Sequence, residues 1–187
     1  MKGIALFALI VFSVQAAAEP ETYVIDGKHT FPRFEYSHFG FSNQIQRFDR
    51  TSGKIVIDRA AKTGSVEVAI DVNSVDTGNT ELTAHLLSEE FFDAKHFPAI
   101  LFKSRTMRFD DDRVAAVDGN LTIKGITKPV TLTVTSFKCM PHPLIKKEAC
   151  GANATAKILR TDFNLGKYAP AVSDEVTLSI AVEAVKE

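Results

Sequence analysis

The sequence predicts an all-β, antiparallel fold of about eight strands, a number that can close into a small barrel. Three observations carry this prediction. Apolar and polar residues alternate with a period of two over most of the chain beyond residue 33, as expected for strands with one buried and one wet face. Short turn segments rich in Gly, Asp and Asn separate these runs. A helical pattern occurs only near Asn79–Phe92.

The alternation is clearest in five segments, each with one apolar face. In chain order they are residues 33–38, 54–58, 65–72, 130–135 and 176–183. The positions on their apolar faces include Phe34, Tyr36, His38, Val68, Ile70, Leu132 and Ile180. A two-sheet sandwich shows the same periodicity as a barrel, so the pattern alone leaves both architectures open.

One connection, Asn73–Phe102, is much longer than the two to five residues that usually join hairpin strands. Leu86 and Phe91 fit one or two helical turns. Pro98 ends this stretch, because the residue before a proline prefers extended geometry. Phe102 then lies on the apolar face of a new strand. We expect a short helical lid over one end of the fold.

The first 18 residues have the pattern of a secretory signal peptide. Lys2 supplies a positive charge, Gly3–Val14 is a short apolar run, and Ala16–Ala18 offers small residues for cleavage. The run is shorter than the roughly 20 residues of a spanning helix. We expect export, cleavage after Ala18, and a single domain over residues 19–187.

Composition and motifs argue against several function classes. A formal net charge of −1 gives no field that would attract nucleic acid. No later segment is apolar enough to span a bilayer, so stable membrane insertion is not expected. The chain has no G-x-S-x-G, H-E-x-x-H or glycine-rich phosphate loop, and its five histidines are scattered. We therefore expect no catalytic site, metal or cofactor.

The two cysteines, Cys139 and Cys150, flank a turn segment between two alternating runs. In an exported chain, such a pair is expected to form a disulfide. The rival interpretation is a metal site that includes His142. It is disfavoured because three ligands at this spacing match no standard zinc site.

Two features of one run concern the interior. Ala152, Ala154 and Ala156 place three short side chains on one face, which would leave space inside the fold. Continued alternation would also turn Arg160 and Asp162 inward. A buried charge needs a partner, so Arg160 either pairs with a carboxylate such as Asp162 or meets the polar head of a ligand. The structural pair is favoured.

Four motifs resemble the YceI family. They are H-L-x-S-x-x-F-F-D-x-x-x-F-P-x-I-x-F-x-S at His85–Ser104, D-G-N-L-T-I-K-G-I-T-K-P-V at Asp118–Val130, I-x-R-x-D-F at Ile158–Phe163, and D-x-x-H-T…F-x-x-S-H-F-G from Asp26 to Gly40. In the last motif Asp26, His29 and His38 match family positions, without an assigned role. The motifs cover essentially the whole mature chain in order.

The resemblance implies an exported bacterial protein of the periplasm, with a lipocalin-like barrel that binds a long isoprenoid or a similar lipid. It thereby favours the barrel over the sandwich. The residues expected to line such a ligand site are Phe34, Tyr36, His38, Val68, Ile70, Phe102, Leu132, Ala154, Ala156, Arg160 and Ile180.

Three functions follow as hypotheses. The first is a binding protein that sequesters or carries an isoprenoid-type lipid, such as a polyprenyl phosphate or a quinone. The second is an enzyme acting on such a lipid, with His38 as acid or base. The third is an envelope stress protein with a solid core that acts through its surface. The sequence leaves the oligomeric state open, a dimer included.

Overall fold

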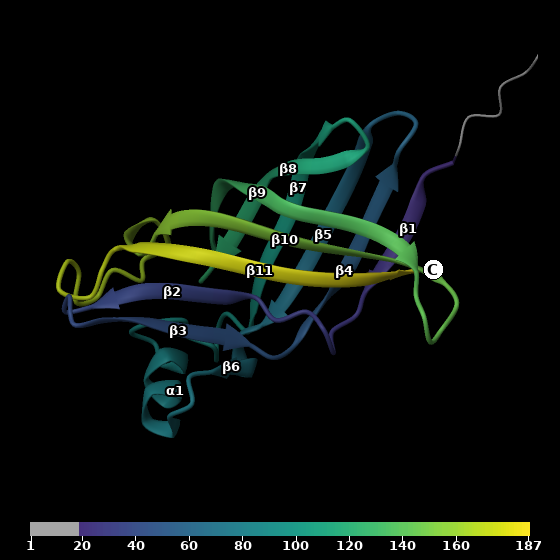
Figure 1. Cartoon of the computed structure of the whole chain (residues 1–187). Helices are drawn as coiled ribbons and strands as arrows, with labels where there is room; N and C mark the ends of the chain where they lie inside the picture. The colour runs from purple at the N-terminus through teal and green to yellow at the C-terminus, as the bar shows by residue number, and fades with distance from the viewer. Residues whose placement is uncertain (1–18) are drawn as a thin grey trace, which may run out of the picture.

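The computed structural model describes residues 19–187. The signal peptide expected at residues 1–18 lies outside this part. Eleven strands, one α-helix and two short 3-10 helices follow one another (Figure 1). The strands are β1 (Glu21–Ile25), β2 (Arg33–His38), β3 (Ser42–Phe48), β4 (Thr51–Asp58), β5 (Thr63–Asp71), β6 (Val75–Asp76), β7 (Ala99–Asp110), β8 (Arg113–Ile123), β9 (Ile126–Pro141), β10 (Glu148–Leu159) and β11 (Glu175–Lys186). The helices are η1 (Val72–Ser74), α1 (Thr80–Leu87) and η2 (Arg160–Phe163).

The strands close into an antiparallel barrel of eight. Hydrogen bonds join β1, β4, β5, β7, β8, β9, β10 and β11 in that order, and β11 pairs back onto β1. The strands β1, β4 and β5 are interrupted, and β2, β3 and β6 continue them in the same places in the sheet. For example, β1 and β2 both pair with β11, through Val24↔Val185 and Phe34↔Leu178. The prediction of an eight-stranded antiparallel barrel is thus confirmed, with three strands interrupted.

The interior of the barrel is apolar because alternate side chains point inward. The largest group of buried residues joins the inner faces of β7–β9 to the segment that carries α1, and partly buried residues of β5 and β10 pack against it. It includes Phe102, Val117, Leu121 and Val134. A smaller group around Tyr23 and Ile57 fills the end of the barrel that holds the C-terminus. Among residues 19–187, no helix has the length and hydrophobicity needed to cross a membrane.

The helix α1 is shorter than the sequence suggests. The Asn79 side chain accepts a hydrogen bond from the Leu82 amide and so caps its N-terminus. Its last residue is Leu87, because the Ser88 amide turns back to the His85 carbonyl. The expected helical residues beyond it, including Phe91, lie in turns. Asp93, in the left-handed region with φ of 48°, reverses the chain there.

A disulfide and a polar cluster occupy the end of the barrel opposite α1. Cys139 and Cys150 are cross-strand partners on β9 and β10 and are joined by an S–S bond of 2.03 Å. The predicted disulfide is therefore present in the structure. Its sulfur atoms lie close to the Glu148 carboxylate, but both are already bonded to each other.

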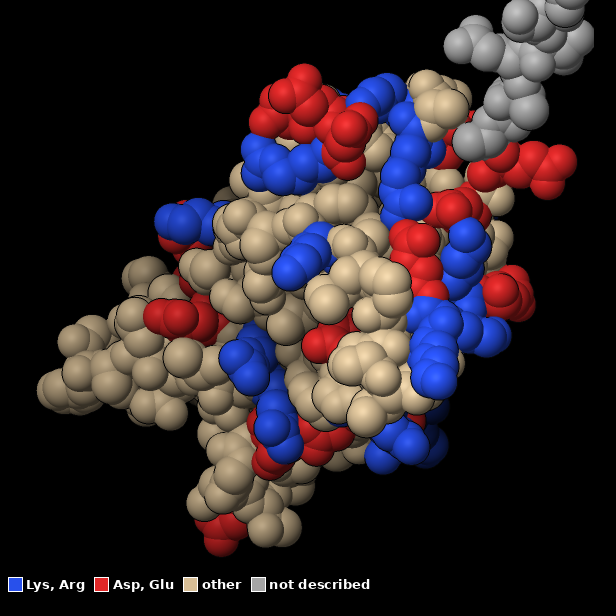
Figure 2. All heavy atoms as spheres, turned by 45° about the vertical axis from the view of Figure 1, so that its right-hand side comes forward, with Lys and Arg blue, Asp and Glu red and all other residues tan. Residues whose placement is uncertain are grey.

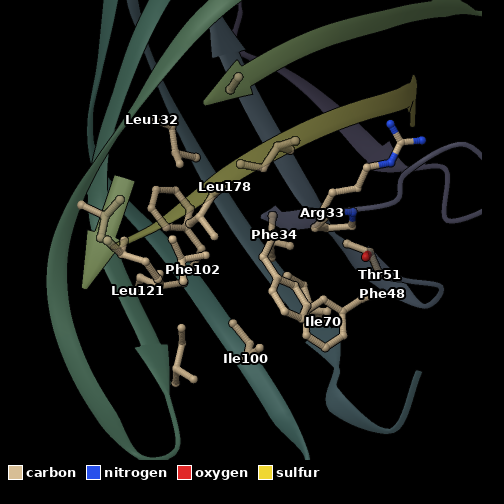
Figure 3. A pocket seen from close by; sticks show the side chains of 18 of the residues that line it. Arg33, Phe34, Phe48, Thr51, Ile70, Ile100, Phe102, Leu121, Leu132 and Leu178 are labelled. Carbon is tan, nitrogen blue, oxygen red and sulfur yellow. The ribbon is translucent and has the colours of Figure 1, made fainter. Parts of the chain in front are cut away.

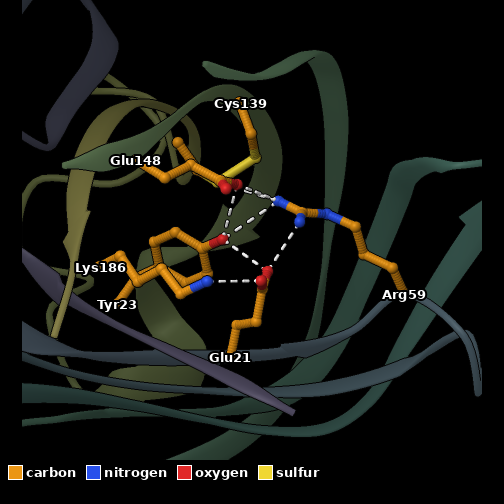
Figure 4. A network of polar contacts seen from close by, with 7 residues as sticks. Glu21, Tyr23, Arg59, Cys139, Glu148 and Lys186 are labelled. Atoms are coloured by element: carbon orange, nitrogen blue, oxygen red, sulfur yellow. Dashed lines mark hydrogen bonds and ion pairs between the residues drawn. A yellow bond between two sulfur atoms is a disulfide. The ribbon is translucent and has the colours of Figure 1, made fainter. Parts of the chain in front are cut away.

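Next to the disulfide lies what we call the closed-end cluster, shown in Figure 4. Its members are Glu21, Tyr23, Arg59, Glu148 and Lys186. Arg59 contacts both carboxylates at 2.6 Å and donates to the Tyr23 hydroxyl at 3.1 Å. Tyr23 is 0% exposed, and burial raises the pKa of its hydroxyl. The cluster ties β1 and β10 to the connection after β4, and it plugs this end of the barrel.

The closed-end cluster should make the protein sensitive to acid. Hydrogen bonds from Arg59 and Tyr23 hold the pKa of Glu148 below its ordinary value of 4.5. A depressed carboxyl pKa contributes stability above the unfolded pKa, and this stability is lost as the pH falls through the folded pKa. We expect the free energy of unfolding to drop below about pH 4.5. Glu148→Gln should cost about 1 kcal/mol at pH 7 and flatten the drop.

Urea unfolding between pH 7 and pH 3 measures both effects. Glu175→Gln is the control, because Glu175 makes its ion pair with Lys157 on the exposed surface, where such pairs contribute little. An unchanged pH slope in Glu148→Gln would show that the cluster does not carry the acid sensitivity.

Candidate ligand-binding cavity

The barrel encloses a cavity of about 510 Å³, within the range of small-molecule sites in proteins. It extends from Ile25 and Ile57, beside the closed-end cluster, to His38 and Tyr168 at the other end. Side chains from strands on opposite sides of the barrel converge on it, as Figure 3 shows for Phe34, Phe102 and Leu132. The cavity therefore occupies the long axis of the barrel.

Its lining is almost wholly apolar. In the described part of the chain, the only side chains on its wall with a formal charge at neutral pH are Arg33 and Arg160, and no carboxylate lies among them. Phe34, Phe48 and Phe92 form an aromatic cluster with ring centroids 5.6 to 6.0 Å apart. Such a surface favours a ligand that is mostly hydrocarbon.

The expected ligand-lining residues fall mainly where the alternation placed them. Ten of them lie on the cavity wall; these are Phe34, Tyr36, His38, Val68, Ile70, Phe102, Leu132, Ala154, Arg160 and Ile180. The eleventh, Ala156, is buried but does not reach the cavity. Ala152 and Ala154 do line it, so two of the three small side chains of β10 border open space. Their contact with a ligand stays a prediction.

Arg160 is not paired with Asp162. The chain leaves the sheet after Leu159, and η2 turns Asp162 outward, where its nearest cation is Lys128 at 3.9 Å. The Arg160 guanidinium, 9% exposed, instead donates to backbone carbonyls of the following loop. Its four acceptors are the carbonyl oxygens of Ser173, Leu165, Lys167 and Val172, at 2.8, 2.6, 3.2 and 2.8 Å.

These bonds decide between the two interpretations of Arg160. Four of its five N–H donors are used, so the side chain holds the loop of residues 164–174 in place. The hypothesis that it pairs with Asp162 is wrong, and little donor capacity is left for a ligand head. Burial lowers the pKa of Arg160, but a guanidinium stays charged in proteins.

The opening of the cavity, which we call the mouth, lies between three segments. They are the β2–β3 turn, the C-terminal end of α1 with its following turns, and the 164–174 loop. His85 lies 4.7 Å from the Phe91 ring and 6.3 Å from that of Tyr168. An ion pair between Glu90 and Lys167 joins the same two segments. The α1 segment thus meets the 164–174 loop across the mouth.

The sequence did not indicate two of these features. Tyr168 lies in a loop with no periodicity, so only its aromatic character could have marked it. Thr51 begins β4 and lines the cavity, and its hydroxyl has no hydrogen-bond partner in the structure although the residue is 7% exposed. Its position is a candidate contact for a ligand oxygen.

Of the family-matched residues Asp26, His29 and His38, the first two lie away from the cavity. Asp26 and His29 form a 2.7 Å ion pair in the exposed connection between β1 and β2. The hydrogen bond to the Asp26 carboxylate raises the pKa of His29. His38 is at the mouth, with its ring 4.6 Å from that of Phe39. No carboxylate accompanies it on the cavity wall in residues 19–187.

Comparisons with known proteins agree with this architecture. Protein YceI of Salmonella agona is 36% identical over 184 residues, which cover 97% of this chain and 95% of that protein. The crystal structure of BcnA from Burkholderia cenocepacia is similar with a TM-score of 0.73 and 25% identity, over 85% of this chain and 98% of that one.

A polyisoprenoid-binding domain from Saccharophagus degradans shares the fold with a TM-score of 0.64 at 19% identity, over 88% of this chain and 98% of that domain. The YceI-like domain family matches residues 23–184, which is nearly all of the described chain. The protein therefore belongs to the YceI-like family.

Proposed function

We propose that the protein is an exported binding protein that carries or sequesters an isoprenoid-type lipid in its barrel cavity. The observation that supports this proposal most directly is the continuous apolar cavity of about 510 Å³. Burial of hydrocarbon there would contribute roughly 25 cal/mol per Å² of apolar area removed from water. The fold shared with a polyisoprenoid-binding domain supports the same class of ligand. The signal-like residues 1–18 support action in the periplasm.

The cavity also favours a binding function over the two other hypotheses, a stress protein with a solid core and an enzyme. A protein with a solid core would fill the volume between Phe34 and Leu132, because interiors are packed to high density. An enzyme using His38 would need a second titratable group within hydrogen-bond reach, and the cavity wall offers His38 no carboxylate in the described chain. We propose that the ligand is held by apolar area and leaves chemically unchanged.

The polar atoms on the cavity wall restrict which head group a bound lipid can carry. Arg160 is committed to the 164–174 loop, and Arg33 is exposed at the edge of the cavity. The free hydroxyl of Thr51 can donate one hydrogen bond to a ligand oxygen. A neutral oxygen-bearing lipid, such as an isoprenoid alcohol or a quinone, therefore fits this interior better than a phosphorylated one.

A chain-length series tests the proposal. Native mass spectrometry of protein purified without detergent should first show a discrete added mass. After delipidation, affinity for geraniol, farnesol and geranylgeraniol should rise roughly tenfold or more per isoprene unit until the cavity is full, because apolar burial scales with area. Affinity that is independent of chain length would contradict the proposal.

Thr51→Val supplies a matched control for the head group. The change keeps the shape of the side chain and removes a hydroxyl with no partner, so stability should hold or rise. Affinity for farnesol should fall about threefold to tenfold, the equivalent of one neutral hydrogen bond, while affinity for the corresponding hydrocarbon should be unchanged. Equal effects on both ligands would exclude Thr51 as a polar contact.

A further inference from the structure

The β2–β3 turn presents bare aromatic side chains beside the mouth. Phe41 is 89% exposed and Phe39 is 53% exposed. Phe39 and Gly40 have φ values of 52° and 72°, the pattern of a tight type I′ hairpin turn. A bulky residue at positive φ is a genuine outlier, since Asn or Gly fits such a position better. Exposed Phe side chains thus occupy a turn where both solubility and backbone conformation disfavour them.

The hairpin itself carries no charge around its turn. Residues Tyr36–Gln46 contain no Lys, Arg, Asp or Glu, although charged residues make up 24% of the whole chain. Figure 2 shows the lobe that carries the turn, at the far left, as tan at its tip, whereas blue and red side chains are spread over the body of the barrel. Ile45, 60% exposed on β3, adds to the same apolar arm.

The exposed arm is continuous with the cavity. Phe39 and Tyr168 are both about half exposed and also line the cavity. The Phe39 amide donates to the Ala171 carbonyl at 2.8 Å, which fixes the turn against the 164–174 loop. Apolar side chains therefore lead from the tip of the hairpin through the mouth to the interior, with the Glu90–Lys167 ion pair beside them.

We propose that this tip, residues 38–42 with Tyr168, docks the mouth onto the surface of a lipid bilayer. The inference rests on the proposed function, because a water-insoluble isoprenoid chain is taken from or given to a membrane. Aromatic rings settle at the boundary between head groups and acyl chains, where neither a matching groove nor an opposite charge is needed. A convex tip whose hairpin carries no charge suits that boundary.

The size of the tip argues against a second copy of the chain as its partner. A fully buried aromatic side chain covers about 150–250 Å², and of the three rings here Phe39 and Tyr168 are only about half exposed. Together they fall short of the roughly 800 Å² that each partner contributes to a stable interface. A bilayer has no such area requirement.

Single-tryptophan reporters test the docking, because the chain has no Trp. Phe41→Trp places the probe at the tip. Leu144→Trp places it in the turn between β9 and β10, at the opposite end, where Leu144 is 84% exposed. With phosphatidylcholine vesicles added to the full mature protein, the emission of the Phe41→Trp variant should shift to shorter wavelength. The emission of the Leu144→Trp variant should not shift.

Vesicle flotation gives the second measurement. Phe41→Ser should reduce the vesicle-bound fraction at least fivefold, and Leu144→Ser should leave it unchanged. An emission shift only in the Leu144→Trp variant, or equal flotation of all variants, would overturn the proposal. A concentration-dependent dimer in solution that Phe41→Ser abolishes would overturn it too, since a second copy would then cover the tip.

The outcome is separable from that of the proposed function. Phe41 does not line the cavity, so Phe41→Ser should keep the affinity for farnesol in detergent-free solution and slow only its uptake from vesicles. Docking with no isoprenoid bound would refute the lipid-carrier proposal alone. Isoprenoid binding without docking would refute the membrane proposal alone.

Discussion

Replacing Ala154 by Phe is expected to lower isoprenoid affinity at least tenfold while changing the free energy of unfolding by less than about 1 kcal/mol. The Ala154 side chain borders the cavity, so a phenyl ring there takes volume that the ligand would occupy. Because the ring enters open space, no packed side chain has to move.

Ala156→Phe is the matched control two residues along the same strand. Ala156 is 8% exposed but does not border the cavity, so its added ring must displace packed neighbours. Such overpacking typically costs about 1–3 kcal/mol. Urea unfolding and farnesol titration of both variants measure the contrast. If Ala154→Phe destabilised the protein as much as Ala156→Phe and kept its ligand, the volume beside β10 would not be a binding site.

Arg160→Met is expected to lower the free energy of unfolding by about 3–5 kcal/mol, since it removes the hydrogen bonds of one buried and three partly buried carbonyls at once. The 164–174 loop would lose the contacts that hold it against η2. Arg160→Lys should recover less than half of the loss, because an ammonium group cannot reproduce the fork of a guanidinium.

Arg33→Met serves as the control, since Arg33 is the other charged side chain on the cavity wall and is exposed. Its effect on stability should stay within about 0.5 kcal/mol. Equilibrium urea denaturation of the three variants decides the matter. Unchanged stability of Arg160→Met together with a large loss of affinity would instead make Arg160 a contact for the ligand head.

The alternation of residues was enough to predict the barrel wall. A strand in a closed barrel has one inner face, so Phe34, Val68, Leu132 and Ile180 could be assigned to the interior from spacing alone. The strand count followed from the same pattern. Spacing could not distinguish a barrel from a sandwich, because the closing pair, β1 with β11, joins opposite ends of the chain.

The errors share one cause, the extension of a local pattern beyond the end of its element. The inward position of Asp162 assumed that β10 continued past Leu159, whereas a 3-10 turn begins there. The longer helix assumed that Phe91 continued the spacing of Leu87, whereas Ser88 ends the helix. In both places a backbone hydrogen bond decides the outcome, and side-chain periodicity carries no information about it.

If the protein carries a lipid as proposed, the plug formed by Tyr23 and Arg59 at one end of the barrel restricts the route of that lipid. A ligand cannot pass through a barrel that is closed at one end. It must leave through the same mouth by which it entered. Uptake and delivery then use the same mouth and cross the same energy barrier. The direction of net lipid movement therefore depends on which membrane binds the lipid more favourably. Between two membranes, such a protein would work as a shuttle that detaches, diffuses and reorients, and never as a standing conduit.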